Sequence, residues 1–543
     1  MSSDLAMPSR RRALRLAGGA ATAASASVLL PSPADAARRR AAPDRPRTLE
    51  EDDARQSRKR RRKYRPARYR ATPVLSVQSR HLVNRFSFGI TPQLAAEVRA
   101  AGGHLAWFDR QLATPYDARA RGLADWWPDL HLSAAAIFKR ATMLDRDTLE
   151  VGYDIGKRTV VRRIVSPTPV LEVMTKFWEN LLHVPIAADN VSVFRADYGE
   201  QIRARALGRY DDLLKTAVLH PAMLMYLGNA GSTKAHPNEN LGRELLELHT
   251  LGVGHHTEDD VKASARILTG WRVKLYSTWE PFYSEVDHWT GPVRVRDFAD
   301  DNVAADGRDL TLRFLSYLSH HPDTARRIAT KLVRTFVSDQ VPKALVERLA
   351  AVYLANDTQI RPVLRTLVRS PEFKKAVDQK VRDADEDVAA SYRLLGARIS
   401  RPRSDFSAAN QVYWQVAGLG LAPLTWPRPD GPPVDNAAWS TATRVLASVS
   451  LHWEMAGGWP EDDVTFARRT SYLPQKEMAF RKFVDHLSRV LLQRPSTEDL
   501  LHACCLATGY RPTTRVTKRS DLFRGRWQKL MTTFLDSPAY YRH

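Results

Sequence analysis

The sequence predicts a mainly α-helical protein: a multi-helix globular domain with a few irregular loops and at most a short pair of strands. From residue 74 onward, apolar residues recur three and four positions apart, as in TLRFLSYLSHHPDTARRIATKLVRTFV and KALVERLAAVYL, which is the spacing of one helix face. Prolines separate these segments, and alternating strand patterns are scarce. The stretch HWTGPVRVRDFAD predicts the strand pair, and TWPRPDGPPVDNAAW predicts a long loop.

Residues 1–36 predict an export signal. Three consecutive arginines at 10–12 precede an uncharged run over residues 16–30, and Ala34 and Ala36 are the small residues that a signal peptidase recognises. Because SRRRALRL resembles a twin-arginine signal, we expect export of an already folded chain, a route that favours a bound metal or cofactor. A disordered basic tail is the alternative interpretation.

Residues 37–73 predict a disordered linker. They carry 13 Arg and two Lys against five acids, a net charge of +10 out of +22 for the chain, and such a segment cannot bury enough apolar area to fold. We expect it to be a solvated spacer or to bind anionic cell-envelope polymer, and not specific nucleic acid. No apolar run reaches about 18 residues, so we expect no transmembrane segment in the mature chain. The expected location is periplasmic, cell-wall-associated or extracellular.

The helical domain is predicted to occupy residues 74–543, and its most polar helix lies in NENLGRELLELHTLGVG. At 100° per residue, Asn240, Glu244 and Glu247 form one polar stripe beside a stripe of leucines. Arg243 lies one turn before Glu247 and should reach it. Leu251 and Gly252 are expected to end this helix.

The next helix is predicted to begin after Thr257. Thr257 and Asp260 have the spacing of a capping box, and the apolar pattern continues through VKASARILTGW to about Trp271.

The polar stripe has two interpretations. In the first, Glu244 and Glu247 belong to a buried ionic lattice with arginines such as Arg243 or Arg266 of the following helix. In the second, the two carboxylates are catalytic, either as hard ligands of a divalent metal ion or as an acid/base pair, and Asn240 orients them.

Three further side chains are candidates for binding or for support of the site. His249 is predicted about 160° around the helix from Glu247, on the packing side, as a core histidine or as a support behind a site. His288 and Trp289 lie in a predicted loop, where conspicuous polar and aromatic groups often bind ligands.

His183 follows Glu179 by four residues on a polar stripe with Glu172 and Lys176. It is the histidine that we add to Glu244 and Glu247 as a candidate metal ligand, although a solvated face of salt bridges is the default interpretation. The adjacent Cys504 and Cys505 predict buried thiols without a disulfide.

Several motifs together resemble the bacterial family called domain of unknown function 1800. NENLGRELLELHTLGVG, TEDDV and ARILTGW resemble its signature, and HLVNRFSFGITP, FWENLLHVP, LVRTFVSD, LVRSPEF and the PDGPP…AAW loop follow the family order over about residues 78–543. The resemblance implies a mainly helical, commonly exported protein, and it implies no reaction. The family often has Trp-His-Asn-His where this chain has Trp178-Glu179-Asn180-Leu181, so a metal site shared with the family is in question.

We therefore expect an exported hydrolase, in one form metal-dependent, that acts on envelope or extracellular polymers. Glu244 and Glu247 would be its ligands or acid/base groups. The alternative is a non-catalytic binding or scaffold protein that residues 37–73 hold to the envelope. A cofactor-bound redox protein fits the export route, but no motif favours it.

Overall fold

The computed structural model describes residues 65–114 and 123–543. The predicted signal and most of the predicted linker lie outside these residues. The described residues belong to one compact unit and start at Arg65, before the predicted domain start at Val74. The backbone N–H of Tyr69 donates to the Asp485 carboxylate at 2.5 Å, and the Thr72 hydroxyl bonds the His486 ring at 2.6 Å. The last residues of the predicted linker are thus part of the folded unit.

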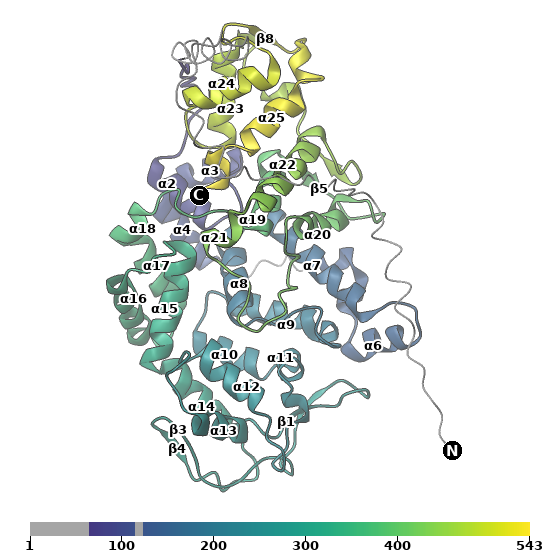
Figure 1. Ribbon diagram of the computed structural model, residues 1–543, viewed down its shortest axis with the longest axis vertical. Coiled ribbons are helices and arrows are strands. Elements are labelled where there is room, and N and C mark those ends of the chain that lie inside the picture. Colours follow the sequence, from purple (N-terminus) through teal and green to yellow (C-terminus); the bar gives the residue numbers. More distant parts are fainter. Residues whose placement is uncertain (1–64, 115–122) are drawn as a thin grey trace, which may run out of the picture. The chain divides into compact units, whose positions relative to one another are not determined.

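Helices dominate the described residues, which confirms the predicted fold class (Figure 1). They are α2 (Val77–Arg85), α3 (Pro92–Ala100), α4 (His104–Ala113), α6 (Ala134–Thr142), α7 (Thr148–Val165), α8 (Pro169–Leu181), α9 (Ser192–Arg205), α10 (Tyr210–Val218), α11 (Pro221–Tyr226), α12 (Glu239–Glu244), α13 (Glu258–Ile267), α14 (Arg308–His320), α15 (Pro322–Phe336), α16 (Lys343–Ala355), α17 (Ile360–Arg369), α18 (Pro371–Lys375), α19 (Ala384–Leu394), α20 (Ala408–Gly418), α21 (Asn436–Trp439), α22 (Ala442–Gly457), α23 (Phe480–Leu491), α24 (Glu498–Thr508), α25 (Trp527–Leu535) and α26 (Pro538–Tyr541).

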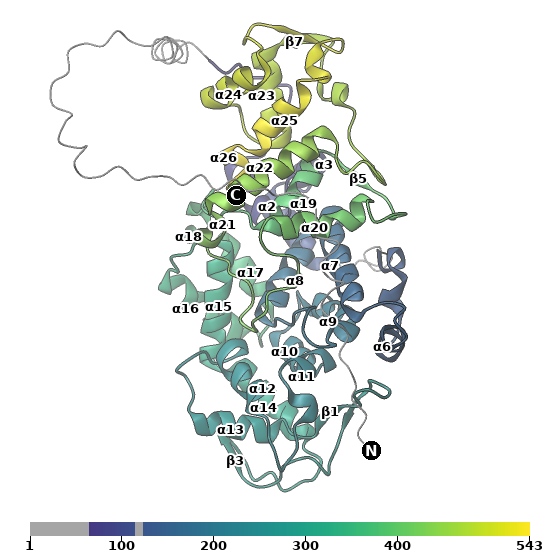
Figure 2. The ribbon, with the colours of Figure 1, turned by 45° about the vertical axis from the view of Figure 1, so that its right-hand side comes forward.

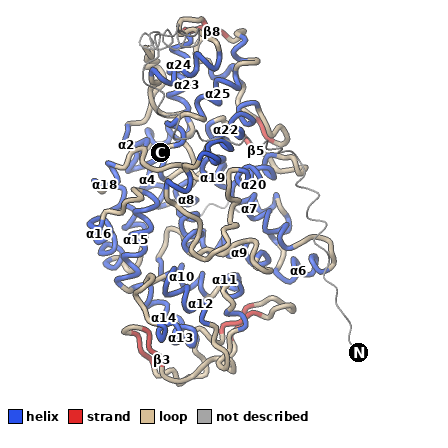
Figure 3. The backbone as a smooth tube through the Cα atoms, in the orientation of Figure 1, coloured by secondary structure: helices blue, strands red, loops and turns tan. Residues whose placement is uncertain are grey.

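Strands form only short antiparallel pairs, drawn red in Figure 3. The pair predicted in HWTGPVRVRDFAD is present as β3 and β4, with Val293 opposite Asp300. Three further pairs occur among the described residues, which is more than the sequence predicted. The strands are β1 (Trp271–Val273) with β2 (Pro281–Tyr283), β3 (Val293–Val295) with β4 (Phe298–Asp300), β5 (Arg398–Ile399) with β6 (Val464–Thr465), and β7 (Glu477–Ala479) with β8 (Arg515–Thr517).

Local sequence signals explain many helix ends. The capping box at Thr257 and Asp260 is confirmed at the start of α13, because each side chain accepts from the other residue's backbone N–H. That helix ends at Ile267 and not near Trp271, since Gly270 takes a φ of +91° and Trp271 begins β1. Proline occupies the first turn of α8, α11, α15, α18 and α26, where the missing N–H is not needed.

The core runs through several helix pairs. Helix α7 packs against α9, α19 and α20, while α8 packs against α4 and α9. Helices α23, α24 and α25 lie together, and α12 and α13 lie with α14 (Figures 1 and 2). Phe86 stacks on Phe336 with ring centroids 4.6 Å apart, which joins α2 to α15. No helix within residues 65–114 and 123–543 is long and apolar enough to cross a membrane.

Charged residues also lie inside the structure, between α7, α8 and α9. Glu172 pairs with Arg203 at 2.6 Å and Glu179 with Arg195 at 2.9 Å, and all four side chains are at most 5% exposed. The polar stripe of α8 therefore forms salt bridges as expected, but it is buried and not solvated. Its partners come from α9, which sequence spacing on α8 alone cannot reveal.

Candidate functional site

The helix predicted to carry the polar stripe changes its pitch in the middle. Helix α12 ends at Glu244 and continues as a π-helical turn over Leu245–His249. Because a π turn bonds i to i+5, rotations of 100° per residue do not hold beyond Glu244. Glu247 is half-buried whereas His249 is fully buried, so His249 lies on the packing side as predicted.

Glu244, Glu247 and Arg243 lie together on a partly exposed face. Arg243 approaches Glu247 at 3.8 Å, which confirms that predicted contact, and makes closer ion pairs with Glu258 at 2.7 Å. Glu247 also lies 3.5 Å from the His256 ring. Burial, and then the Glu247 carboxylate, raise the pKa of Glu244. Glu247 and Arg243 thus belong to a partly exposed set of ion pairs and not to the buried lattice that was predicted.

The other predicted site residues lie elsewhere. Asn240 is exposed. His249 is fully buried and donates from Nδ1 to the Leu181 carbonyl at 3.1 Å. His288 is buried, with its Nε2 2.9 Å from the Asn302 side-chain oxygen, and the Trp289 ring lies 4.7 Å from the Arg266 guanidinium. Arg266 therefore stacks on this ring and forms no ion pair with the glutamates.

The candidate metal ligands are not gathered. His183 is 1% exposed and donates from Nε2 to the Trp426 carbonyl at 2.8 Å. Burial lowers the pKa of His183 to about 4, so its ring is neutral near pH 7. Among the described residues, no group of three or more His, Cys, Asp or Glu side chains is placed to hold a metal ion. The described donor set does not fit a bound metal.

Neutralising both stripe carboxylates tests this placement. We expect the Glu244→Gln/Glu247→Gln double variant to change the free energy of unfolding by no more than about 1 kcal/mol, because exposed ion pairs contribute little. Urea unfolding measures this, and Glu172→Gln, which leaves buried Arg203 without its carboxylate, is the destabilised comparison. A loss in the double variant as large as in Glu172→Gln would contradict the surface assignment.

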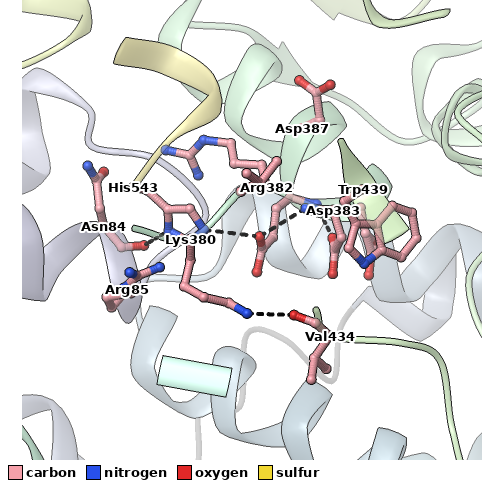
Figure 4. A network of polar contacts seen from close by, with 12 residues as sticks. Asn84, Arg85, Lys380, Arg382, Asp383, Asp387, Val434, Trp439 and His543 are labelled. Carbon is pink, nitrogen blue, oxygen red and sulfur yellow. Dashed lines mark hydrogen bonds and ion pairs between the residues drawn. The ribbon is translucent and has the colours of Figure 1, made fainter. Parts of the chain in front are cut away.

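A cavity of about 290 Å³ lies elsewhere in the domain, between α2, α8, α15, α19 and the loop 426–439. Figure 4 shows Arg85, Lys380, His543, Asp383 and Trp439 around it. Neither Glu244 nor Glu247 lines this cavity. Its lining combines cations, carboxylates and aromatic rings: Arg85, Lys176, Lys331, Arg334, Lys380 and Arg428; Asp383, Glu386, Asp430 and Asp435; and Phe177, Phe336, Trp426 and Trp439.

Carboxylates from the first turn of α19 surround Lys176. Its ammonium lies 2.5 Å from Asp383, 3.4 Å from Asp385 and 3.5 Å from Glu386. Burial, and then the Glu386 carboxylate, raise the pKa of Asp383 to about 6, although Lys176 opposes the shift. Burial acts to raise the pKa of Glu386 too, but Lys176 and His543 hold it well below its usual value.

The pKa values of the two acids are therefore shifted in opposite directions, that of Asp383 above and that of Glu386 below its usual value. Such a split between neighbouring carboxyls is typical of acid/base sites.

The loop 426–439 forms one wall of the cavity. His183 holds the Trp426 carbonyl, and the Lys380 ammonium holds the Val434 carbonyl at 2.6 Å. The Trp439 indole N–H donates to the Pro433 carbonyl at 2.9 Å. Gly431, with a φ of +74°, lies so close to α8 that a Cβ would be 2.0 Å from the Asn180 carbonyl oxygen. The predicted long loop is thus fixed against α8, but its last residues form the short helix α21 and not loop.

Sequence reasoning missed this cavity because its residues are far apart in the chain. The available signal was the aromatic, Pro-rich loop TWPRPDGPPVDNAAW and the Phe-Trp helix, FWENLLHVP, that it contacts. His183 was identified, but its role is to hold the loop.

Comparison with known proteins gives one match. No curated protein and no solved structure matches the chain. The model of a family described as protein of unknown function (DUF1800) matches residues 81–542, which is most of the chain and includes the helices and the loop that line the cavity. The chain belongs to this family.

Proposed function

We propose that this protein is an exported hydrolase that acts on envelope or extracellular polymers, and that its active site is the cavity beside α19 and not the 240–247 stripe. The observation that carries the proposal is Asp383, a carboxyl with a pKa of about 6 that faces a cavity walled by Trp426 and Trp439. A group with such a pKa donates and accepts a proton near neutral pH. Aromatic walls suit the apolar faces of a bound polymer unit.

The proposed step transfers one proton through Asp383. The protonated carboxyl gives its proton to the leaving-group oxygen as the bond to the polymer breaks. Water adds its hydroxyl to the other fragment, and the remaining water proton returns to Asp383. One water is consumed and two hydroxyl ends are formed, with no oxidant or reductant. Because the described residues do not fit a metal ion, no step uses one.

The groups around Asp383 set the pH dependence of this step. Lys176 reaches it from α8, and Glu386 and Asp385 lie beside it on α19. Arg163 of α7 pairs with Asp385, the Arg444 guanidinium of α22 donates to the Asp383 carbonyl, and His543 lies 3.4 Å from Glu386. If the protonated acid is required, kcat/KM falls as pH rises above about 6, roughly tenfold per unit.

The Asp383→Asn variant tests the proposal. Asparagine is also a good helix N-cap, so we expect α19 and the melting temperature to be retained while hydrolysis falls by at least about 100-fold. Purified envelope and extracellular polymers are incubated with the protein, and newly formed chain ends are measured against pH. If the wild type releases no ends from polymers that it binds, the non-catalytic binding or scaffold alternative replaces the hydrolase.

A further inference from the structure

One cation of the cavity, Arg85, is buried with most of its donors unused. It is the last residue of α2 and is 3% exposed. Its Nη2 donates to the Ala376 carbonyl at 3.1 Å, but Nε and Nη1 have no hydrogen-bond partner among the described residues. Buried polar N–H groups normally have hydrogen-bond acceptors. Nε and Nη1 of Arg85 therefore lack the acceptors that buried donors usually have.

The charge of Arg85 is also uncompensated. The charges of Glu386 and Asp378 act to raise the pKa of Arg85. No carboxylate of the described residues, however, lies within ion-pair distance of its guanidinium. Burial lowers the pKa of Arg85 to about 9, so the group is still a cation at neutral pH. An unpaired buried charge is costly for a folded protein, and an anion in the cavity would remove that cost.

Lys331 supplies a second cation without a partner. It projects from α15 and lines the same cavity, and its ammonium has no hydrogen bond or ion pair with any described residue. Burial, and then the neighbouring Arg327 and Arg334, lower its pKa. A bound negative charge would oppose this lowering of the pKa of Lys331.

The remaining cations of the cavity already have acceptors. Lys380 lies 2.5 Å from Asp339, Arg428 lies 3.1 Å from Asp430, and Lys176 is surrounded by the α19 carboxylates. Arg334 lies 4.0 Å from Asp435. Arg85 and Lys331 are therefore the two lining cations of the described structure that remain available to a ligand.

We propose that Arg85 and Lys331 bind an oxyanion group, a phosphate or a carboxylate, of the ligand that enters this cavity. The Arg85 guanidinium supplies a positive charge and two unused donors, Nε and Nη1, which point in different directions and would each donate to a separate oxygen, and Lys331 adds a point charge. The inference rests on the proposed function in one respect: it makes the hydrolysed polymer an acidic one.

The experiment measures anion binding directly, without hydrolysis. Isothermal titration with inorganic phosphate, with glucuronate and with uncharged glucose is carried out on the full chain at constant ionic strength, because salt screens exposed charges. The variants are Arg85→Met, Arg85→Lys and Lys331→Met. Lys262→Met is the matched control, since Lys262 is an exposed lysine of α13 outside the cavity. Thermal melts verify that each variant is folded.

We expect phosphate or glucuronate to bind and glucose not to bind. Arg85→Met and Lys331→Met should each lower the affinity for the anion by at least about tenfold. Arg85→Lys should lower it by less, and Lys262→Met should leave it unchanged. The anion that binds more tightly shows whether the polymer carries phosphates or acidic sugars. Binding no stronger than that of glucose, or folded Arg85 and Lys331 variants that bind as the wild type, would overturn the proposal.

The Asp383→Asn variant separates this inference from the proposed function. If it binds the anion normally and the wild type hydrolyses no polymer, the anion site stands and the hydrolase fails. If the wild type hydrolyses a neutral polymer, depends on Asp383 and binds neither anion, the hydrolase stands and the anion site fails.

Discussion

Replacing His452 by glutamine is expected to lower the free energy of unfolding by about 3–5 kcal/mol, the cost of breaking a buried ion pair by removing one partner. His452 is fully buried on α22, where its Nε2 donates to Asp387 at 2.8 Å and its Nδ1 to Asp536 at 2.7 Å. Asp387 is itself fully buried and also accepts from Arg444 and Ser448. Glutamine cannot supply a positive charge between the two carboxylates. Urea unfolding of both proteins measures the difference.

The same histidine predicts a pH dependence of stability. Burial acts to lower its pKa, but Asp387 and Asp536 raise it to about 9. Because the folded-state pKa lies above the unfolded value of 6.5, the contribution is complete below 6.5 and is lost as pH rises through about 9. Between these values the wild type should lose stability while His452→Gln loses much less. His320→Gln is the control, since His320 pairs with Asp357 at the surface. If the unfolding free energies of the wild type and His452→Gln changed with pH in parallel, His452 would not be a buried imidazolium.

Replacing Gly431 by alanine is expected to disable the cavity while leaving the fold. The added Cβ would lie 2.0 Å from the Asn180 carbonyl oxygen, so the loop 426–439 must move away from α8. We expect the affinity for the anion and any polymer hydrolysis to fall by at least about tenfold, because moving groups that position a ligand lowers both binding and rate. The loss of unfolding free energy should be small, about 1–2 kcal/mol, because the strain is local.

Gly254→Ala is the matched control for this variant. Gly254 also has a positive φ, +81°, but nothing lies within 4 Å of the position of its Cβ. The two variants therefore share the backbone strain and differ in the clash. Equal ligand affinity in Gly431→Ala and Gly254→Ala would show that the loop does not form the binding wall.

The sequence predicted those parts of the fold that depend on neighbouring residues. The capping box at Thr257 and Asp260, the loop 426–439 and the strand pair at β3 and β4 all follow from local signals. Cys504 and Cys505 are buried free thiols, as predicted.

The candidate site depended on contacts that local patterns do not contain. The sequence pattern of the 238–251 helix did not reveal the π turn over Leu245–His249. The available charge of Arg85 is recognisable only once α2, α15 and α19 are brought together around one cavity. Sequence composition showed many arginines, but not which of them lacked a carboxylate.

The salt bridges between α8 and α9 have a consequence for the order in which the protein folds. If α8 packed into the core before α9 arrived, Glu172 and Glu179 would lose water without meeting Arg203 and Arg195. Uncompensated charges of that kind raise the energy of a half-assembled state by several kcal/mol. The two helices therefore dock as one cooperative step, and the cavity wall that α8 provides forms only once α9 is in place.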